Sequence, residues 1–248
     1  MEPVVVGDRT LVCRVWGEGV ADIVLLHDGL GSIAQWRDVP NAIHAATGRT
    51  VLAYDRSGHG ASSPTPTGPW PADWLHQEAE VLGELLDQRA VARPLLVGHS
   101  DGGSIALIAA ALGRELRAVI TLAAHTYVES VCVERIRSMR ADVEGWIQRL
   151  GRVHQNPSAV FDAWSGAWVG DEFASWDIRP TLGVIECPVL VVQGIDDEYG
   201  TPEQAWSTAA AIGDNSTCVL LPAVGHLLHH EVPEQVVRLV QDVQRSSR

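Results

Sequence analysis

The sequence has few cysteines, no long apolar run and no recognisable leader. Four cysteines occur in 248 residues, and they form neither a CxxC pair nor another ligand cluster. A disulfide framework and a cysteine-based metal site are therefore not indicated, and we expect reduced, mostly buried thiols. No stretch approaches the roughly 18 apolar residues of a membrane-spanning helix. The opening MEPVVVGDRT lacks a basic region followed by an apolar one, so we expect a cytoplasmic protein without a signal peptide.

Basic residues are also scarce in this chain. Eighteen Lys and Arg stand against 31 Asp and Glu, which gives a formal net charge of −13. Such a surface repels nucleic acid phosphates and anionic lipid headgroups, so neither is an expected partner, and the simplest role of the charge is solubility. With 46% hydrophobic and 20% charged residues, the composition is typical of a soluble globular protein.

Short apolar runs alternate with segments of helical periodicity along most of the chain. We expect strands at 10–17, 22–27, 50–55, 94–99, 117–125, 188–194 and 216–224. We expect helices at roughly 34–46, 73–88, 101–113 and from Pro233 onward. This alternation predicts an α/β fold, with a mostly parallel sheet and helices on both faces. Ligands of such sheets bind beyond the carboxyl ends of the strands.

One segment, residues 127–185, breaks this alternation. It lacks a convincing strand and contains helical patches such as VCVERIRSMRADVEGWIQRL. We expect a helical lid there, inserted into a core formed by residues 1–126 and 186–248. Four of the nine tryptophans of the chain fall in this segment: Trp146, Trp164, Trp168 and Trp176. They could pack between helices or form the wall of an apolar pocket, for which Trp164 and Trp168 are the candidates.

The stretch PLLVGHSDGGSIALI holds one serine between two glycines at the end of an apolar run. Gly98-His99-Ser100-Asp101-Gly102 fits the pattern G-x-S-x-G and lies between an expected strand and an expected helix. A sharp turn at this place strains the backbone of the serine and leaves no room for side chains at the two glycines. Ser100 would then lie at a helix N-terminus, where free N–H groups favour developing negative charge. The context indicates a nucleophile.

A nucleophilic serine needs a general base and an acid that orients the base. The order of the candidate residues resembles the α/β-hydrolase superfamily over essentially the whole chain, in which nucleophile, acid and histidine follow in that order. Here Ser100 is followed by QGIDDEYGTP and then by LPAVGHLLHHEVPE. The resemblance implies His226 as the base, because the family's histidine follows a glycine. It implies Asp197 rather than Asp196 as the acid, three positions after Gly194.

The resemblance also implies an oxyanion hole made of two backbone N–H groups. One is the N–H of Asp101, and the other is that of Gly29 in the segment HDG, where the family often reads H-G-x. A carboxylate of Asp28 or Asp101 that points inward would oppose the oxyanion or hold a polar substrate group through a proton or water. The simpler interpretation is that both side chains point away, with Asp101 favouring the start of the helix. Another family stretch, YDRSGHGASS, is expected to shape a loop beside the site through Asp55, Arg56, Gly58 and Gly60.

The resemblance implies a serine hydrolase that cleaves a small ester, thioester or lactone through an acyl-enzyme, without a metal or an organic cofactor. A small-molecule acyl substrate is the expected partner of a monomer or homodimer. The same residues could instead catalyse C–C bond hydrolysis or cofactor-free perhydrolysis. An alternative outside enzymes is a receptor that uses the same pocket to sense a ligand. An HxxHH metal site of His226, His229 and His230 is conceivable, but a triad explains the neighbouring acids better.

Overall fold

The computed structural model of the chain describes residues 1–64 and 68–246. Within these residues eight strands form one sheet in the order β1-β2-β4-β3-β5-β6-β7-β8. The β1–β2 and β2–β4 pairs are antiparallel, and the other neighbouring strands are parallel. The strands are β1 Glu2–Val6, β2 Arg9–Trp16, β3 Ile23–Leu26, β4 Val51–Asp55, β5 Leu95–His99, β6 Ala118–Leu122, β7 Val189–Gly194 and β8 Ser216–Leu221. The predicted α/β fold with a mostly parallel sheet is confirmed.

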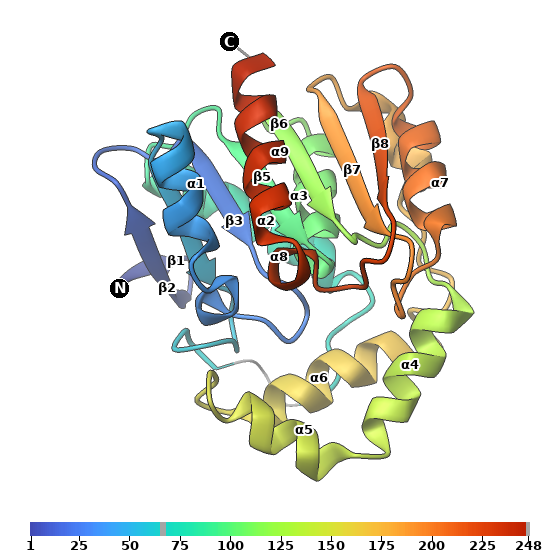
Figure 1. Cartoon of the computed structure of the whole chain (residues 1–248). Helices are drawn as coiled ribbons and strands as arrows, with labels where there is room; N and C mark the ends of the chain where they lie inside the picture. Colours follow the sequence, from blue (N-terminus) through green and yellow to red (C-terminus); the bar gives the residue numbers. More distant parts are fainter. Residues whose placement is uncertain (65–67, 247–248) are drawn as a thin grey trace.

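Helices cover both faces of the sheet (Figure 1). One apolar core lies on the side of α1 and α9, and the other on the side of α2 and α3. In α2, Trp74–Gln88, the buried residues Leu75, Ala79, Leu82 and Leu86 recur at helical spacing and face the core. The helices outside the segment between β6 and β7 are η1 Ile33–Trp36, α1 Val39–Thr47, α2 Trp74–Gln88, α3 Asp101–Ala111, α7 Pro202–Ile212, α8 Leu228–Glu231 and α9 Pro233–Ser246.

The single helix expected at 34–46 is two helices in the structure. Arg37 has a φ of 50°, a left-handed conformation that cannot continue η1. A second helix, α1, starts two residues later, with Pro40 in its first turn, where the missing N–H of proline is tolerated. In the described residues no helix is both long and apolar enough to cross a bilayer.

The chain between β6 and β7 begins with three helices that lie beyond the sheet edge at which the parallel strands end (Figure 1), and it ends with a short helix that packs against α3 and α7. Its elements are α4 Ser130–Arg140, α5 Val143–Leu150, α6 Pro157–Val169 and η2 Arg179–Val184. Helix α6 packs against both α4 and α5. The β-type pairing recorded in this segment is one isolated bridge, between Tyr127 and Asp177. This arrangement places α4, α5 and α6 across the edge where ligands of parallel sheets bind.

Candidate active site

Ser100 occupies the turn between β5 and α3 in a strained backbone conformation. Its φ is 51° and its ψ is −122°, values that a residue with a side chain rarely adopts. A Cβ added at Gly98 would lie 2.2 Å from the carbonyl oxygen of Gly102, and one added at Gly102 would lie 2.2 Å from that of Leu26. Any side chain at either glycine would therefore push strand and helix apart. The two glycines allow the close packing that holds Ser100 at the apex of the turn.

Asp197 and His226 meet across the loops that follow β7 and β8. The Nδ1 atom of His226 lies 2.9 Å from Oδ2 and 3.0 Å from Oδ1 of Asp197, whose side chain is fully buried. The carboxylate also accepts hydrogen bonds from the Tyr199 N–H, at 2.7 Å, and from Gln193 Nε2, at 2.6 Å. The neighbouring Asp196 is exposed. Because Asp197 holds the Nδ1–H tautomer, Nε2 of His226 is left to accept a proton.

The pKa shifts of this pair follow from burial and from its mutual attraction. Burial alone would raise the pKa of Asp197, but the charge and hydrogen bond of His226 outweigh burial and bring that pKa below its ordinary value. Burial alone would lower the pKa of His226, and the charge of Asp197 outweighs it and raises that pKa. The pair therefore favours an imidazolium on His226 whenever a proton is transferred to it.

Two residues that hold His226 in place carried no signal in the sequence. His99, the variable position of the serine motif, is fully buried, and its Nε2 donates to the carbonyl oxygen of His226 at 2.8 Å. The ring of Tyr199 lies 4.6 Å from the ring of His226. Both contacts join segments far apart in the chain, so only the folded structure could place them.

Ser100 and His226 line a common cavity of about 600 Å³ under α4, α5 and α6. Trp164 and Trp168, the two pocket candidates, line it as well, and they are 7% and 1% exposed. Trp168 also packs edge-on against His125, another wall residue, with ring centroids 5.2 Å apart. The two interpretations of the tryptophans are thus compatible, because the same rings pack between helices and face the cavity.

The backbone N–H groups of Gly29 and Asp101 are both available beside Ser100. Asp101 is the first residue of α3, so its N–H has no acceptor within the helix. The N–H of Gly29 donates to no group in residues 1–64 and 68–246. Two side chains contact the backbone carbonyl groups of this loop. Arg56 Nη2 donates to the Asp28 carbonyl oxygen at 2.6 Å, and His59 Nε2 lies 2.9 Å from the Gly29 carbonyl oxygen. Both N–H groups therefore remain candidates for the predicted oxyanion hole.

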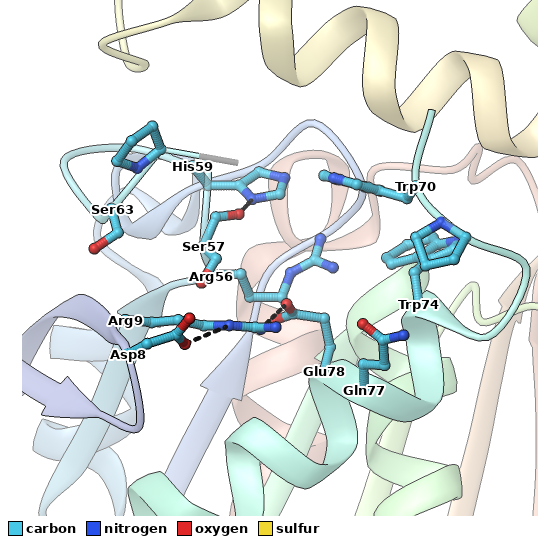
Figure 2. A pocket seen from close by; sticks show the side chains of 12 residues that line it. Asp8, Arg9, Arg56, Ser57, His59, Ser63, Trp70, Trp74, Gln77 and Glu78 are labelled. Carbon is cyan, nitrogen blue, oxygen red and sulfur yellow. Dashed lines mark hydrogen bonds and ion pairs between the residues drawn. The ribbon is translucent and has the colours of Figure 1, made fainter. Parts of the chain in front are cut away.

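The loop after β4 supports this arrangement. Asp55 accepts from the Ile33 N–H at 2.7 Å and the Ala61 N–H at 3.2 Å, and Gly60, with a φ of 54°, packs directly on its carboxylate. Figure 2 shows the fully buried Arg56 of this loop, whose side chain lies near the rings of His59, Trp70 and Trp74. A second cavity of about 220 Å³ lies there. These contacts agree with a structural role for the loop.

The expectation that the Asp101 side chain points away from the site is wrong. Its Oδ2 accepts a hydrogen bond of 2.8 Å from Nε1 of Trp164 on α6. A Cβ added at Gly29 would lie 2.4 Å from the same oxygen, so the carboxylate faces the loop that carries the Gly29 N–H. Burial raises the pKa of Asp101 to about 6, although Arg56 and Trp164 act in the opposite direction. The indole N–H of Trp164 explains the inward orientation.

Asp28 also lines the cavity rather than pointing away from it. Its Oδ1 accepts from the Leu30 N–H at 2.9 Å, and its Oδ2 lies 3.3 Å from Nδ1 of His99. Burial would raise the pKa of this carboxyl, but the hydrogen bond and charge of His99 outweigh burial and lower it well below its ordinary value. The lowered pKa favours the carboxylate form of Asp28.

The three histidines near the C-terminus do not converge on a common point. His229 packs against Trp36 and His99, at ring distances of 4.7 Å and 4.6 Å. His230 points elsewhere, with its Nε2 at 2.6 Å from the carbonyl oxygen of Gln35. In the part of the chain that the structure describes, no group of three metal-ligating side chains occurs. The geometry does not favour the HxxHH alternative.

Comparison with known proteins agrees with this geometry. The sequence profile of the alpha/beta hydrolase family matches residues 23–239. The chain is 28% identical over 236 residues to serine hydrolase BPHL of Mus musculus, covering 91% of this chain and 80% of that protein. It is 30% identical over 259 residues to 2-succinyl-6-hydroxy-2,4-cyclohexadiene-1-carboxylate synthase of Salmonella paratyphi A, covering 92% and 95%. The enol-lactonase of Burkholderia xenovorans LB400 shares the fold, with a TM-score of 0.78, 24% identity and coverage of 98% and 100%. The chain belongs to the alpha/beta hydrolase family and is a hydrolase.

Proposed function

We propose that this hydrolase cleaves a small carboxylic ester, thioester or lactone, with Ser100 as nucleophile, His226 as general base and Asp197 as the acid that orients His226. The proposal rests on how these three residues are arranged. Ser100 stands at the apex of a strained turn and lines the same cavity as His226, whose Nδ1 is held by a buried carboxylate at 2.9 Å. This arrangement supports the assignment of a nucleophile, a base and an orienting acid.

The first half of the reaction forms an acyl-enzyme. Nε2 of His226 takes the proton of the Ser100 hydroxyl as its Oγ attacks the carbonyl carbon. The carbonyl π electrons move to the oxygen, and the N–H groups of Gly29 and Asp101 stabilise the resulting oxyanion. Asp197 stabilises the imidazolium, which accords with the raised pKa of His226. When the tetrahedral intermediate collapses, the imidazolium gives its proton to the departing alcohol or thiol.

The second half of the reaction releases the acid. A water molecule gives one proton to Nε2 of His226 and attacks the acyl carbon, and the same two N–H groups stabilise the second oxyanion. Collapse of this intermediate breaks the bond to Oγ of Ser100, which takes the proton back from His226. The products are a carboxylic acid and the free enzyme, so atoms and charges balance without a further reactant.

We further infer that residues 127–185 act as a lid and that Trp164 and Trp168 contact the apolar part of the substrate. Both rings belong to α6 and line the cavity that contains Ser100. Large aromatic surfaces favour an apolar acyl or alcohol group through burial of its surface. The similarity in fold to an enzyme named as an enol-lactonase keeps lactones among the candidate substrates.

Hydrolysis of p-nitrophenyl butyrate near pH 8 tests the assignment. Ser100→Ala should lower turnover by at least ~10³-fold, because the remaining groups bind the substrate without attacking it. Asp197→Asn should lower it by up to ~10⁴-fold, since an amide can hold His226 in the wrong tautomer.

Asp196→Asn is the matched control for the Asp197 variant. It changes the neighbouring carboxylate in the same way but at an exposed position, so it should leave the rate within about twofold. Full activity of the Ser100 variant would overturn the mechanism. A severe loss in the Asp196 variant with a mild one in the Asp197 variant would overturn the choice of acid.

A further inference from the structure

Four arginines line the cavity that contains Ser100, in a chain whose net charge is −13. They come from three separate segments: Arg37 follows η1, Arg135 lies on α4, and Arg149 and Arg152 lie at and just beyond the end of α5. All four are exposed, whereas Ser100 is 7% exposed. The cations therefore surround the mouth of the cavity and not its floor.

Three of these four cations have no anionic partner among the residues that the structure describes. Arg149 lies 3.4 Å from Asp142 and stacks on the ring of Trp146 at 4.4 Å. For Arg37, Arg135 and Arg152, no ion pair with a carboxylate of residues 1–64 or 68–246 is found within 4.0 Å.

Arg135 is held close to the catalytic histidine. Its guanidinium lies 5.5 Å from the centroid of the Tyr199 ring, and that ring lies 4.6 Å from the ring of His226. Only one aromatic ring therefore separates this cation from the proposed general base. A cation–π contact of this kind restricts the side chain and keeps its charge at the cavity wall.

The acidic residues that line the cavity differ from the arginines, because the protein supplies hydrogen-bond donors to them. The carboxylate of Asp28 accepts from the Leu30 N–H, and that of Asp101 accepts from Trp164 Nε1. Glu198 also lines the cavity and is exposed. Its Oε2 lies 3.4 Å from the backbone nitrogen of His226. The interior carboxylates of Asp28 and Asp101 thus accept hydrogen bonds from the protein, while three of the four arginines have no ion pair among the described residues.

We propose that the natural substrate carries a carboxylate on the part that extends from the scissile carbonyl toward the mouth, where Arg135 and Arg152 bind it. The inference rests on the proposed function, since it deepens the description of the same cavity. An anion close to the carbonyl would face Asp28 and Asp101 and be repelled. An anion several bonds away from the carbonyl would instead reach the arginines. The apolar part of the substrate, between the carbonyl and the anion, would then lie against the tryptophan rings of α6.

Matched esters test the charge preference. The first pair is p-nitrophenyl hexanoate and the mono-p-nitrophenyl ester of adipic acid, which have the same acyl length and differ in the terminal methyl or carboxylate. The second pair is benzyl butyrate and 4-carboxybenzyl butyrate, which place the charge on the alcohol. In at least one pair, kcat/KM should be about threefold to tenfold higher for the anionic ester at low salt. The preference should shrink in 0.5 M NaCl, because salt screens exposed charges.

Arginine variants identify which side chains produce the preference for the anionic ester. Arg135→Gln and Arg152→Gln should each reduce the ratio of anionic to neutral kcat/KM by about threefold, mainly through KM for the anionic ester. Arg137→Gln is the matched control, because Arg137 is an exposed residue of the same helix α4 that does not line the cavity. Its ratio should equal that of the wild type.

The outcomes separate this inference from the proposed function. Hydrolysis of both pairs without a preference for the anionic ester, or an equal loss of the ratio in the Arg137 variant, overturns the carboxylate proposal and leaves the serine mechanism standing. A protein that hydrolyses none of the four esters, and whose Ser100 does not react with a fluorophosphonate, contradicts the proposed function itself.

Discussion

Replacement of Asp101 by asparagine provides a quantitative test of the electrostatics beside the nucleophile. Asp101 is 1% exposed, and burial raises its pKa from the ordinary value of 3.8 to about 6. The unfolded chain loses this proton near the ordinary value, so at intermediate pH the folded protein binds the proton and the unfolded chain does not. The contribution of this group to the free energy of unfolding therefore decreases as the pH rises from about 4 to about 6.

The size of the effect follows from the two pKa values. Their difference corresponds to a destabilisation of about 3 kcal/mol at pH 8, where Asp101 is ionised in both states. At pH 5 the folded group is still protonated, and the destabilisation is about 2 kcal/mol. Asparagine has nearly the same shape and can still accept from Trp164, but it carries no charge. The gain in unfolding free energy from Asp101→Asn should thus be about 1 kcal/mol larger at pH 8 than at pH 5.

Urea denaturation of both proteins at the two pH values measures this difference. Asp196→Asn serves as the control, because it removes an exposed carboxylate and should show no comparable dependence on pH. Other effects of the Asp101 substitution, such as altered packing, cancel when the two pH values are compared. An equal gain at pH 5 and pH 8, or a larger one at pH 5, would refute the view that Asp101 is a buried carboxyl destabilised in its charged form.

Two further predictions concern the rate. Because Asp197 raises the pKa of His226 and the base must be neutral, kcat/KM should fall as the pH drops through that pKa. Asp197→Asn should move this fall to lower pH, and an unmoved profile would show that the ionising group is a different one. Trp164→Ala and Trp168→Ala should change the preference among p-nitrophenyl esters of two to eight carbons. If the variants change only the melting temperature, these rings belong to the core and do not contact the substrate.

The parts of the fold and site that could be predicted depend on local patterns. Short apolar runs marked the buried strands, and the glycines on either side of Ser100 marked positions where backbones touch. The glycine that ends β7 served only as the reference for the spacing to Asp197 that the family resemblance implies. A Cβ at Gly194 would lie 2.2 Å from the carbonyl oxygen of Val224, so this glycine brings the ends of β7 and β8 together. That contact places the following loop, with Asp197, next to His226.

The parts that could not be predicted depend on contacts between distant segments. The direction of the Asp101 side chain is set by Trp164, 63 residues further along the chain. The contact of His99 with the His226 carbonyl spans 127 residues. The arginines at the cavity mouth come from separate segments, each of which is an ordinary exposed position when seen alone. Periodicity and spacing carry no information on such pairs, because they describe neighbours in sequence.

The most direct test of the central claim is to identify the residue that reacts with a fluorophosphonate. The intact protein is incubated with the reagent near pH 8, digested and mapped by peptide mass spectrometry, with Ser100→Ala and heat-denatured wild type treated in parallel. The account predicts one modified residue, Ser100, in the folded wild type and no modification in either control, because only the folded site activates this hydroxyl. Modification of a different serine, or undiminished labelling of the Ser100→Ala protein, would contradict it.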